Sequence, residues 1–387
     1  MEAADMKMGD FVLASSRDDK LSSYGGGAIQ TILKTALENK YVDEVLSFQE
    51  KKSRYELNPV IISQMEQIDS LPLSQFSAYH VLGTSNIPKY LQQNLKSGER
   101  IAIVAKPCDV RALVELAKRM QINFNDLVIL GEICYGKISP KKVKKILDEG
   151  QTDASKIVYE MIKNGTYSTL VGGEIKNYTL GDILDLEESC KRCIEREHPL
   201  SDISFLVIEV NNVTKTLIHI NTEKGLKLLE LASAKLNLEE VNENLLSSLR
   251  DLEQLKDKAE KYKTEQFKIF DKNSEKDRSS YFKELLKNCR KCGMCIKACP
   301  ICICVDCNVA KKRKEIDPIL YFLLRMGHVG DCCVNCGNCD SVCNFLESGP
   351  SLVFHRLSEL SKSALNYDPG KNMNAPLPRT KKTMKKG

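Results

Sequence analysis

Cysteine is the residue type with the greatest capacity for chemistry in this chain. The sequence has sixteen cysteines, and twelve of them follow residue 288. One run has the spacing C-x2-C-x2-C-x3-C-P, and a second run repeats its cysteine spacing. The members are Cys289, Cys292, Cys295 and Cys299 in the first run and Cys333, Cys336, Cys339 and Cys343 in the second. Bacterial ferredoxins bind two 4Fe–4S clusters with such runs, and the fourth cysteine of each run binds the other cluster.

We therefore predict two 4Fe–4S clusters. One is assigned to Cys289, Cys292, Cys295 and Cys343, and the other to Cys299, Cys333, Cys336 and Cys339. Soft thiolates without histidine suit iron–sulfur clusters. A pair of zinc sites, each with four cysteine ligands, is the alternative, although zinc usually takes two separated CxxC pairs. Asn344 stands where the second run would usually have proline, but that proline supplies no ligand, so cluster binding should survive.

Four cysteines outside the double run suggest a third site. Cys108 follows the apolar run 101–105, and Cys134 follows the apolar run 127–130. If both runs are parallel strands, these positions meet at the carboxyl edge of the sheet, where ligands bind in α/β folds. With the lone CxxC of Cys190 and Cys193 they form a candidate third 4Fe–4S site. Ordinary buried or surface thiols are the alternative.

Four more cysteines are not needed as ligands at these three sites. They are Cys302, Cys304, Cys307 and Cys332. They could be buried thiols that behave as small hydrophobic side chains. They could also bind a further metal centre, and the sequence leaves both interpretations open.

The elements that must position these cysteines alternate in type over the first 222 residues. Short apolar runs at 101–105, 127–130, 206–210 and 216–220 are typical of strands, and the stretches 29–37 and 110–120 have helical spacing. This alternation predicts an α/β (α+β) domain over 1–222. Residues 223–288, rich in Leu, Glu and Lys, predict a helical linker. The cysteine module then spans 289–356, and a C-terminal tail spans 357–387.

Composition excludes several classes of function. The net charge is +5 and the aromatic fraction is 6%, which does not suit a nucleic-acid binder. No apolar run approaches the ~20 residues that span a bilayer. The first residues lack the basic and then apolar pattern of a signal peptide. We therefore expect a soluble, cytoplasmic protein.

Several stretches together resemble the β-subunit family of coenzyme F420 hydrogenase and dehydrogenase. They are Ser23-Tyr-Gly-Gly-Gly-Ala28, Lys106-Pro-Cys-Asp-Val-Arg-Ala-Leu113, Leu130-Gly-Glu-Ile-Cys134, Cys190-Lys-Arg-Cys193 with Leu200-Ser-Asp-Ile203, and the cysteine module. The double module looks more like the β subunit of F420-dependent formate dehydrogenase, since the hydrogenase version is shorter and lacks it.

The resemblance implies an electron-transfer flavoprotein subunit that holds FAD and exchanges a hydride with coenzyme F420. Its N-terminal domain would then be the FAD- and F420-binding domain. A flavin suits this role because it accepts hydride pairs and passes single electrons to clusters. A separate catalytic subunit with molybdenum or tungsten would oxidise formate, and a heterodisulfide reductase complex is another possible partner.

The residues that would hold FAD are less sharply indicated. Gly25, Gly26 and Gly27 precede a predicted helix, whose N-terminus could cradle phosphate; a simple glycine-rich turn is the alternative. Lys106 could pair with the pyrophosphate or lie near the flavin, or be a solvated surface lysine. Ser23, Thr84 and Ser85 are polar loop candidates. The GxGxxG fingerprint is absent, so no dinucleotide-binding Rossmann motif is predicted.

Other functions compatible with the sequence are an iron–sulfur relay without F420 activity, the hydrogenase β subunit, and an electron-input subunit linked to heterodisulfide reductase. A flavoprotein of the same fold that uses NAD or ferredoxin is a further alternative. Flavin content and the absorbance of added F420 would separate these possibilities.

Overall fold

The computed structural model describes residues 5–22, 27–50, 57–69, 87–163, 165–181, 185–210, 213–304, 306–346 and 349–377. The described strands of the main sheet lie in the order β11-β1-β10-β9-β5-β4-β2-β3. Their bounds are β1 Phe11–Ser16, β2 Glu44–Glu50, β3 Leu57–Ile62, β4 Ile101–Ala105, β5 Leu127–Glu132, β9 Ile203–Val210, β10 Val213–Ile220 and β11 Leu236–Glu240. The mixed α/β architecture predicted for this region is therefore confirmed.

The centre of the main sheet is parallel and its margins are antiparallel. β2 pairs with β4, β4 with β5, and β5 with β9 in parallel. The strands β4 and β5 are buried along their whole length, as expected for parallel strands covered on both faces. β9 and β10, which contain the apolar runs 206–210 and 216–220, form an antiparallel pair. A second sheet holds β6 Ile157–Lys163, β7 Thr166–Val171 and β8 Glu174–Thr179.

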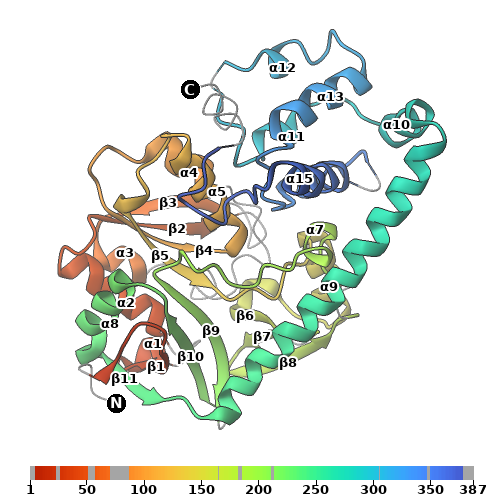
Figure 1. The fold of residues 1–387 in the computed structure, drawn as a ribbon. Helices are drawn as coiled ribbons and strands as arrows, with labels where there is room; N and C mark the ends of the chain where they lie inside the picture. The colour runs from red at the N-terminus through yellow and green to blue at the C-terminus, as the bar shows by residue number, and fades with distance from the viewer. Residues whose placement is uncertain are drawn as a thin grey trace.

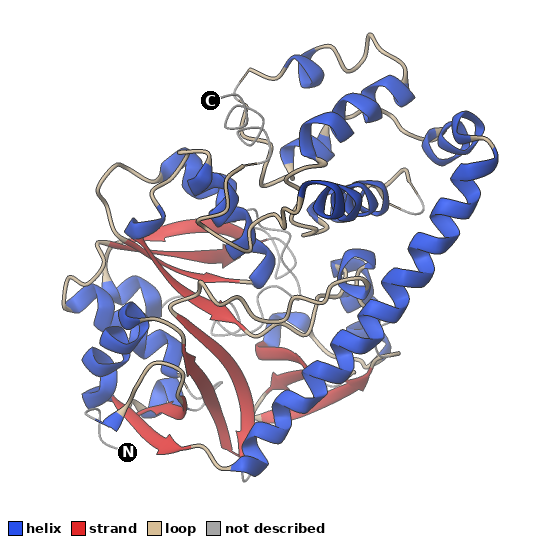
Figure 2. Cartoon of the chain, in the orientation of Figure 1, coloured by secondary structure: helices blue, strands red, loops and turns tan. Residues whose placement is uncertain are grey.

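Helices flank the sheets and connect them (Figures 1 and 2). The N-terminal helices are α1 Asp19–Ser22, α2 Ala28–Glu38, α3 Met65–Asp69, α4 Ile87–Asn94, α5 Pro107–Lys118, α6 Pro140–Glu149, α7 Glu188–Lys191 and α8 Glu223–Ala232. Helix α5 begins at Pro107, where a proline loses no hydrogen bond. Asp109 caps it by accepting from the Lys106 backbone N–H at 3.3 Å.

The segment predicted as a helical linker divides into two parts. Its first part, residues 223–240, contains α8 and the strand β11, which pairs with β1 and extends the main sheet. Its second part contains α9 Glu243–Lys276 and α10 Arg278–Leu286. Strand β11 reads as helical in sequence because it is short and rich in charge, as sheet margins often are.

The cysteine-rich region is helical and stands at the far end of α9 (Figure 1). Its helices are α11 Met294–Lys297, α12 Asn308–Lys311, α13 Pro318–Val329, α14 Asn338–Ser341 and α15 Ser351–Leu365. Phe267 and Phe270 of α9 pack into its core with Tyr321 and Phe354. Arg356 of α15 donates to both carboxylate oxygens of Asp271 on α9, at 2.9 and 2.6 Å. Helix α9 therefore joins this region to the sheet domain.

The described part of the C-terminal tail is ordered against the sheet domain. Helix α15 continues to Leu365, and the residues after it lie along α5. The Arg111 guanidinium donates to the Pro369 carbonyl at 2.6 Å, and the Tyr367 hydroxyl donates to Glu115 at 2.5 Å. Residues 378–387 lie outside the described structure. None of the described helices is long and apolar enough to cross a membrane.

Candidate functional site: three adjoining groups of cysteines

The two cysteine runs of the C-terminal region share one backbone conformation. Lys291 and Asn335, two residues after the first cysteine of each run, have positive φ values of 48° and 59°. Gly293 and Gly337 follow at φ 81° and 73°, and each caps a short helix, α11 or α14. Left-handed residues turn successive backbone N–H groups toward one concave side, an arrangement found at many iron–sulfur sites. The repeated spacing is therefore also a repeated local structure.

In each run a backbone N–H points at the first thiol. Burial raises the pKa of Cys289, and the N–H of Lys291, which donates to this thiol, opposes the rise. The N–H of Asn335 does the same for Cys333, whose pKa burial raises to about 12. Hydrogen bonds of this kind stabilise a thiolate and tune the potential of a bound cluster.

The structure brings the predicted ligands together in two groups across the runs. Group I is Cys289, Cys292, Cys295 and Cys343. Burial contributes most to the raised pKa of Cys289, and the charges of the other three members also raise it. Group II is Cys299, Cys333, Cys336 and Cys339. Burial and the charge of Asp340 contribute most to the raised pKa of Cys339, and the charges of the other three members also raise it. All four thiols of group II line one small cavity. The fourth cysteine of each run lies with the other run.

A single buried arginine lies between groups I and II. Arg325 of α13 is 3% exposed and donates to the Cys302 thiol at 2.6 Å and to the Cys295 carbonyl at 3.2 Å. Burial opposes its charge, but the neighbouring thiols of Cys302, Cys299 and Cys295 raise the pKa of Arg325 on balance. A fixed positive charge thus faces both groups.

The third group forms at the carboxyl edge of the parallel strands. Group III is Cys108, Cys134, Cys190 and Cys193. The parallel register pairs Ala105 with Gly131, which brings the residues after β4 and β5 to the same edge. Burial raises the pKa of Cys134 to about 12, and the nearby Cys190 contributes to this rise. Cys108 and Cys193 line one cavity beside α15. The two cysteines predicted to converge from separate strands do lie together with the CxxC.

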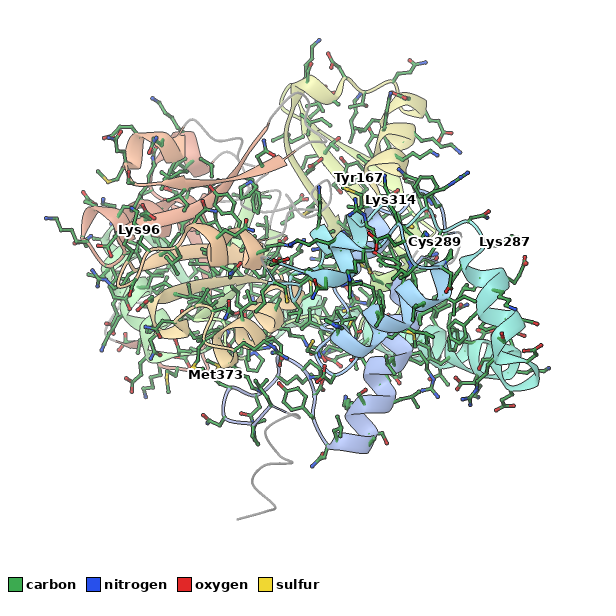
Figure 3. The ribbon with its side chains drawn as sticks, turned by 90° about the horizontal axis from the view of Figure 1, so that it is seen from above. Lys96, Tyr167, Lys287, Cys289, Lys314 and Met373 are labelled. Atoms are coloured by element: carbon green, nitrogen blue, oxygen red, sulfur yellow. The ribbon has the colours of Figure 1, made fainter. Side chains whose placement is uncertain are left out.

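Groups II and III adjoin. Burial and the charge of Asp109 contribute most to the raised pKa of Cys108, and Lys106 opposes them. The charges of Cys336 and Cys134 also raise this pKa. Helix α14 of group II lies on α7, which carries Cys190, so closely that a Cβ on Gly337 would overlap the Ser189 side chain. The chain therefore places the three groups in the order I, II, III. Figure 3 shows Cys289 of group I on the side of the molecule away from Lys96, which precedes β4.

Hydrogen bonds reinforce the contact between α14 and the segment around group III. Lys137 forms an ion pair with Glu187 at 3.0 Å. The Ser341 hydroxyl of α14 accepts from Lys137 at 2.8 Å and donates to Glu187 at 2.7 Å. Lys137 and Glu187 are largely shielded from water and Ser341 is partly buried, so the contact holds the two regions in a fixed relation.

Buried cations that the motif analysis did not single out surround group III. Arg192 and Arg196 are 1% and 2% exposed, and Lys137 is 4% exposed. Arg196 donates to the Cys193 carbonyl at 2.7 Å. Glu187 pairs with Lys137 and Glu188 with Arg192, and thiolates or a thiolate-bound cluster would supply further negative charge. Arg192 lies within the Cys190–Cys193 motif and Arg196 just after it, but nothing in the sequence marked their burial or singled out Lys137.

The predicted flavin residues are only partly described. Ser23, Gly25, Gly26, Thr84 and Ser85 lie outside the described residues. Gly27 has a φ of 63° and precedes α2, and a Cβ there would lie 2.6 Å from the backbone of Leu21. A glycine is therefore required at this turn, and the first N–H groups of an eleven-residue helix follow it.

Lys106 is buried, which contradicts the alternative of a solvated surface lysine. Its ammonium lies 3.9 Å from Asp109 at the start of α5. Burial opposes its charge, but Asp109 and the thiols of Cys108, Cys134 and Cys190 outweigh burial and raise its pKa. Lys106 therefore belongs to the surroundings of group III.

The geometry bears on the choice between zinc and a cluster. Within the ranges that the structure describes, no three Cys, His, Asp or Glu side chains converge closely enough for one metal ion. A 4Fe–4S cubane does not require such convergence, since each thiolate binds a different iron at its own corner. The groups are therefore compatible with cubanes.

Cysteine groups that adjoin the carboxyl edge of a parallel sheet are an arrangement expected of an oxidoreductase subunit. Models of coenzyme F420 hydrogenase/dehydrogenase, beta subunit, match the chain at residues 11–85 for the N-terminal part and 98–244 for the C-terminal part. These matches span more than half of the chain, and the chain belongs to this family of oxidoreductase subunits.

Relatives extend the likeness beyond the family models. A protein named F420-dependent formate dehydrogenase subunit beta, from Methanocaldococcus jannaschii, is 27% identical over 91% of this chain and 93% of its own length. F420-dependent formate dehydrogenase 1 subunit beta of Methanococcus maripaludis is 29% identical over 91% of this chain and 92% of its own. The resemblance inferred from the motifs is thereby confirmed.

The fold is also found in a solved complex. A chain of the F420-reducing NiFe hydrogenase complex from Methanosarcina barkeri superposes with a TM-score of 0.56 at 20% identity. The match covers 67% of this chain and 92% of that chain. At this identity the likeness concerns the fold alone.

Proposed function

We propose that this chain is the electron-transferring flavoprotein subunit of an F420-dependent formate dehydrogenase. It would carry electrons between a partner subunit and coenzyme F420 through its own 4Fe–4S clusters and FAD. The observation that supports this most directly is the order of the three cysteine groups, from the helical region to the sheet edge. The names of the two relatives that span nearly the whole chain support formate as the substrate of the assembled enzyme.

Each cysteine group would bind one cluster. Groups I and II exchange their fourth ligands between runs, as the ferredoxin motif requires. Group III combines thiols from two strand ends and a CxxC, surrounded by the buried cations Lys106, Lys137 and Arg196. These cations would offset the negative charge of a cluster buried at the sheet edge.

The flavin would lie beyond group III, near the carboxyl edge of β4. Gly27 and the first turn of α2 would receive phosphate, together with the neighbouring Gly25 and Gly26, and Lys106 would lie between the flavin and group III. FAD, when bound, exchanges hydride pairs with F420 and single electrons with clusters. The chain itself would fix the distance between the flavin and group III and screen group III from water.

The partner would be a catalytic subunit that oxidises formate and passes the electrons to group I. Formate oxidation releases carbon dioxide, a proton and an electron pair, and the reduction of F420 consumes an electron pair and protons. A molybdenum or tungsten centre in that partner remains an expectation, and so does an association with a heterodisulfide reductase complex.

The test is cofactor analysis and activity of the anaerobically purified chain. We expect bound FAD, iron and acid-labile sulfide in equal amounts, and reduction of F420 by a viologen dye as the artificial donor. Flavin with no F420 reduction would support a relay or an NAD-linked flavoprotein instead. A preparation that holds no flavin after reconstitution would overturn the proposal.

A further inference from the structure

The four cysteines outside groups I to III line a single cavity of about 550 Å³. Cys302, Cys304 and Cys307 come from the loop that follows the first run, with the spacing C-x-C-x2-C. Cys332 lies three residues after the end of α13, directly before the first cysteine of the second run. Cys304 is exposed and Cys332 is buried, so the thiols extend from the surface into the interior.

The walls of this cavity suit a soft anionic group. Its cations include Arg119, Lys297, Lys311 and Arg325, whereas Asp331 is the acid among the lining residues that the structure describes. The remaining surface is largely isoleucine and valine. A cluster bound by four thiolates has a net negative charge, and an apolar cavity with cations would stabilise it.

Two of the thiols already contact groups that would favour a bound cluster. The guanidinium of Arg325 lies 2.6 Å from the Cys302 sulfur. Arg119 and Cys332 line the same cavity. Both arginines are partly or fully buried, so their positive charges would offset the negative charge of a thiolate-bound cluster there.

We propose that Cys302, Cys304, Cys307 and Cys332 bind a fourth 4Fe–4S cluster. Each thiol loses its proton and binds one iron, and the thiols need not converge on one point. The cluster would lie beside group II, since the Cys302 N–H donates to the Cys299 carbonyl at 3.2 Å. Its exposed side at Cys304 would give single electrons an entrance separate from group I. The proposal rests on the proposed function only in that the same chain assembles clusters.

The test is a double substitution at Cys304 and Cys307, which leaves the buried thiols of the cavity in place. The variant C304S/C307S removes two ligands and leaves Cys302 in contact with Arg325. We expect iron and sulfide to fall by about four each per chain, from about sixteen to about twelve. The low-temperature electron paramagnetic resonance signals of groups I to III and the bound flavin should persist. The matched control is K312Q/E315Q, which changes two exposed residues just after the same loop that do not line the cavity and should retain all iron.

Three other outcomes would overturn the proposal. Unchanged iron in C304S/C307S would mean that the thiols are structural. Zinc at this site in place of iron would mean a single-ion centre. Loss of about eight irons, with the signal of group II gone, would mean that the loop merely supports that group. A parallel variant, C289S/C292S, tests group I alone; loss of iron there but not in C304S/C307S would overturn the fourth cluster and leave the proposed function intact.

Discussion

Arg325 is the residue whose position most directly links the chemistry of two cysteine groups. It donates to the backbone of Cys295 in group I and to the Cys302 thiol beside group II. A buried positive charge stabilises the reduced, more negative form of a cluster. The side chain also stacks over Phe354 at 5.4 Å, which fixes it in place. We therefore regard it as a positioning residue that sets the potentials of both groups.

Replacing this arginine should lower both potentials. We expect R325M to shift the midpoint potentials of the two ferredoxin-type clusters downward by about 60 mV or more, which is about tenfold in the equilibrium constant for one electron. A redox titration followed by electron paramagnetic resonance measures the shift. The control is R356M, which removes an arginine of the same region that pairs with Asp271. Equal midpoint potentials of these clusters in R325M and R356M would contradict the prediction.

Group III should be separable from groups I and II by substitution. We expect C190S/C193S to lose about four irons per chain, because two of the four ligands are removed. Signals of groups I and II should remain, while reduction of F420 by the partner's electrons should cease. The variant K191Q, within the same motif, should retain iron and activity. Full iron content in C190S/C193S would mean that group III is a set of ordinary thiols.

At the scale of helices and strands, sequence patterns predicted where the cysteines lie better than they predicted the strand β11 and the buried arginines. The apolar runs at β4 and β5 and the C-x2-C spacings are strong local signals, and the structure brings their cysteines together. Strand β11 was missed because it is only five residues long and lies within a segment rich in Leu, Glu and Lys; it forms by pairing with β1. The buried arginines were missed because burial of a charge depends on tertiary partners that no local pattern shows.

The segment after α15 is the element whose role emerges only from the structure. Glu115, fully buried on α5, accepts from the Tyr367 hydroxyl at 2.5 Å and from the Gly370 N–H at 2.8 Å. His198 contacts the Gly370 carbonyl at 3.0 Å. The tail thus fastens the end of the helical region to the helix that carries Cys108.

Removing one of these contacts should loosen that attachment. We expect Y367F to weaken the tail contact by about 1.5–3 kcal/mol, the usual value for a hydrogen bond to a charged group. Limited proteolysis should then cleave after α15 more rapidly, and the apparent melting temperature should fall. Y90F, at a half-buried tyrosine of α4, provides the comparison. Equal cleavage rates in the two variants would mean that the hydroxyl of Tyr367 contributes little.

At the scale of the whole molecule, two regions must be held at a fixed separation. The helical region carries groups I and II, and the sheet domain carries group III. Among the contacts that join their described residues are three attachments: the aromatic core on α9, the tail on α5, and the contact of α14 with α7. Of these three, the contact of α14 with α7 lies directly between groups II and III. The two helices can approach closely because Gly337 has no side chain and the side chain of Ser189 is small.

A larger side chain at Ser189 should interrupt electron transfer while leaving the cysteines intact. In S189L the leucine would collide with α14, and a close-packed contact relieves such overlap by shifting its elements apart. We expect full iron and flavin content but a severalfold slower reduction of flavin after rapid reduction of groups I and II, as measured by stopped-flow absorbance. The matched control is S189A: the Ser189 hydroxyl is buried without a hydrogen-bond partner among the residues that the structure describes, so its loss should leave the rate unchanged. Equal rates in S189L and S189A would mean that electrons reach the flavin by a route other than the contact between α14 and α7.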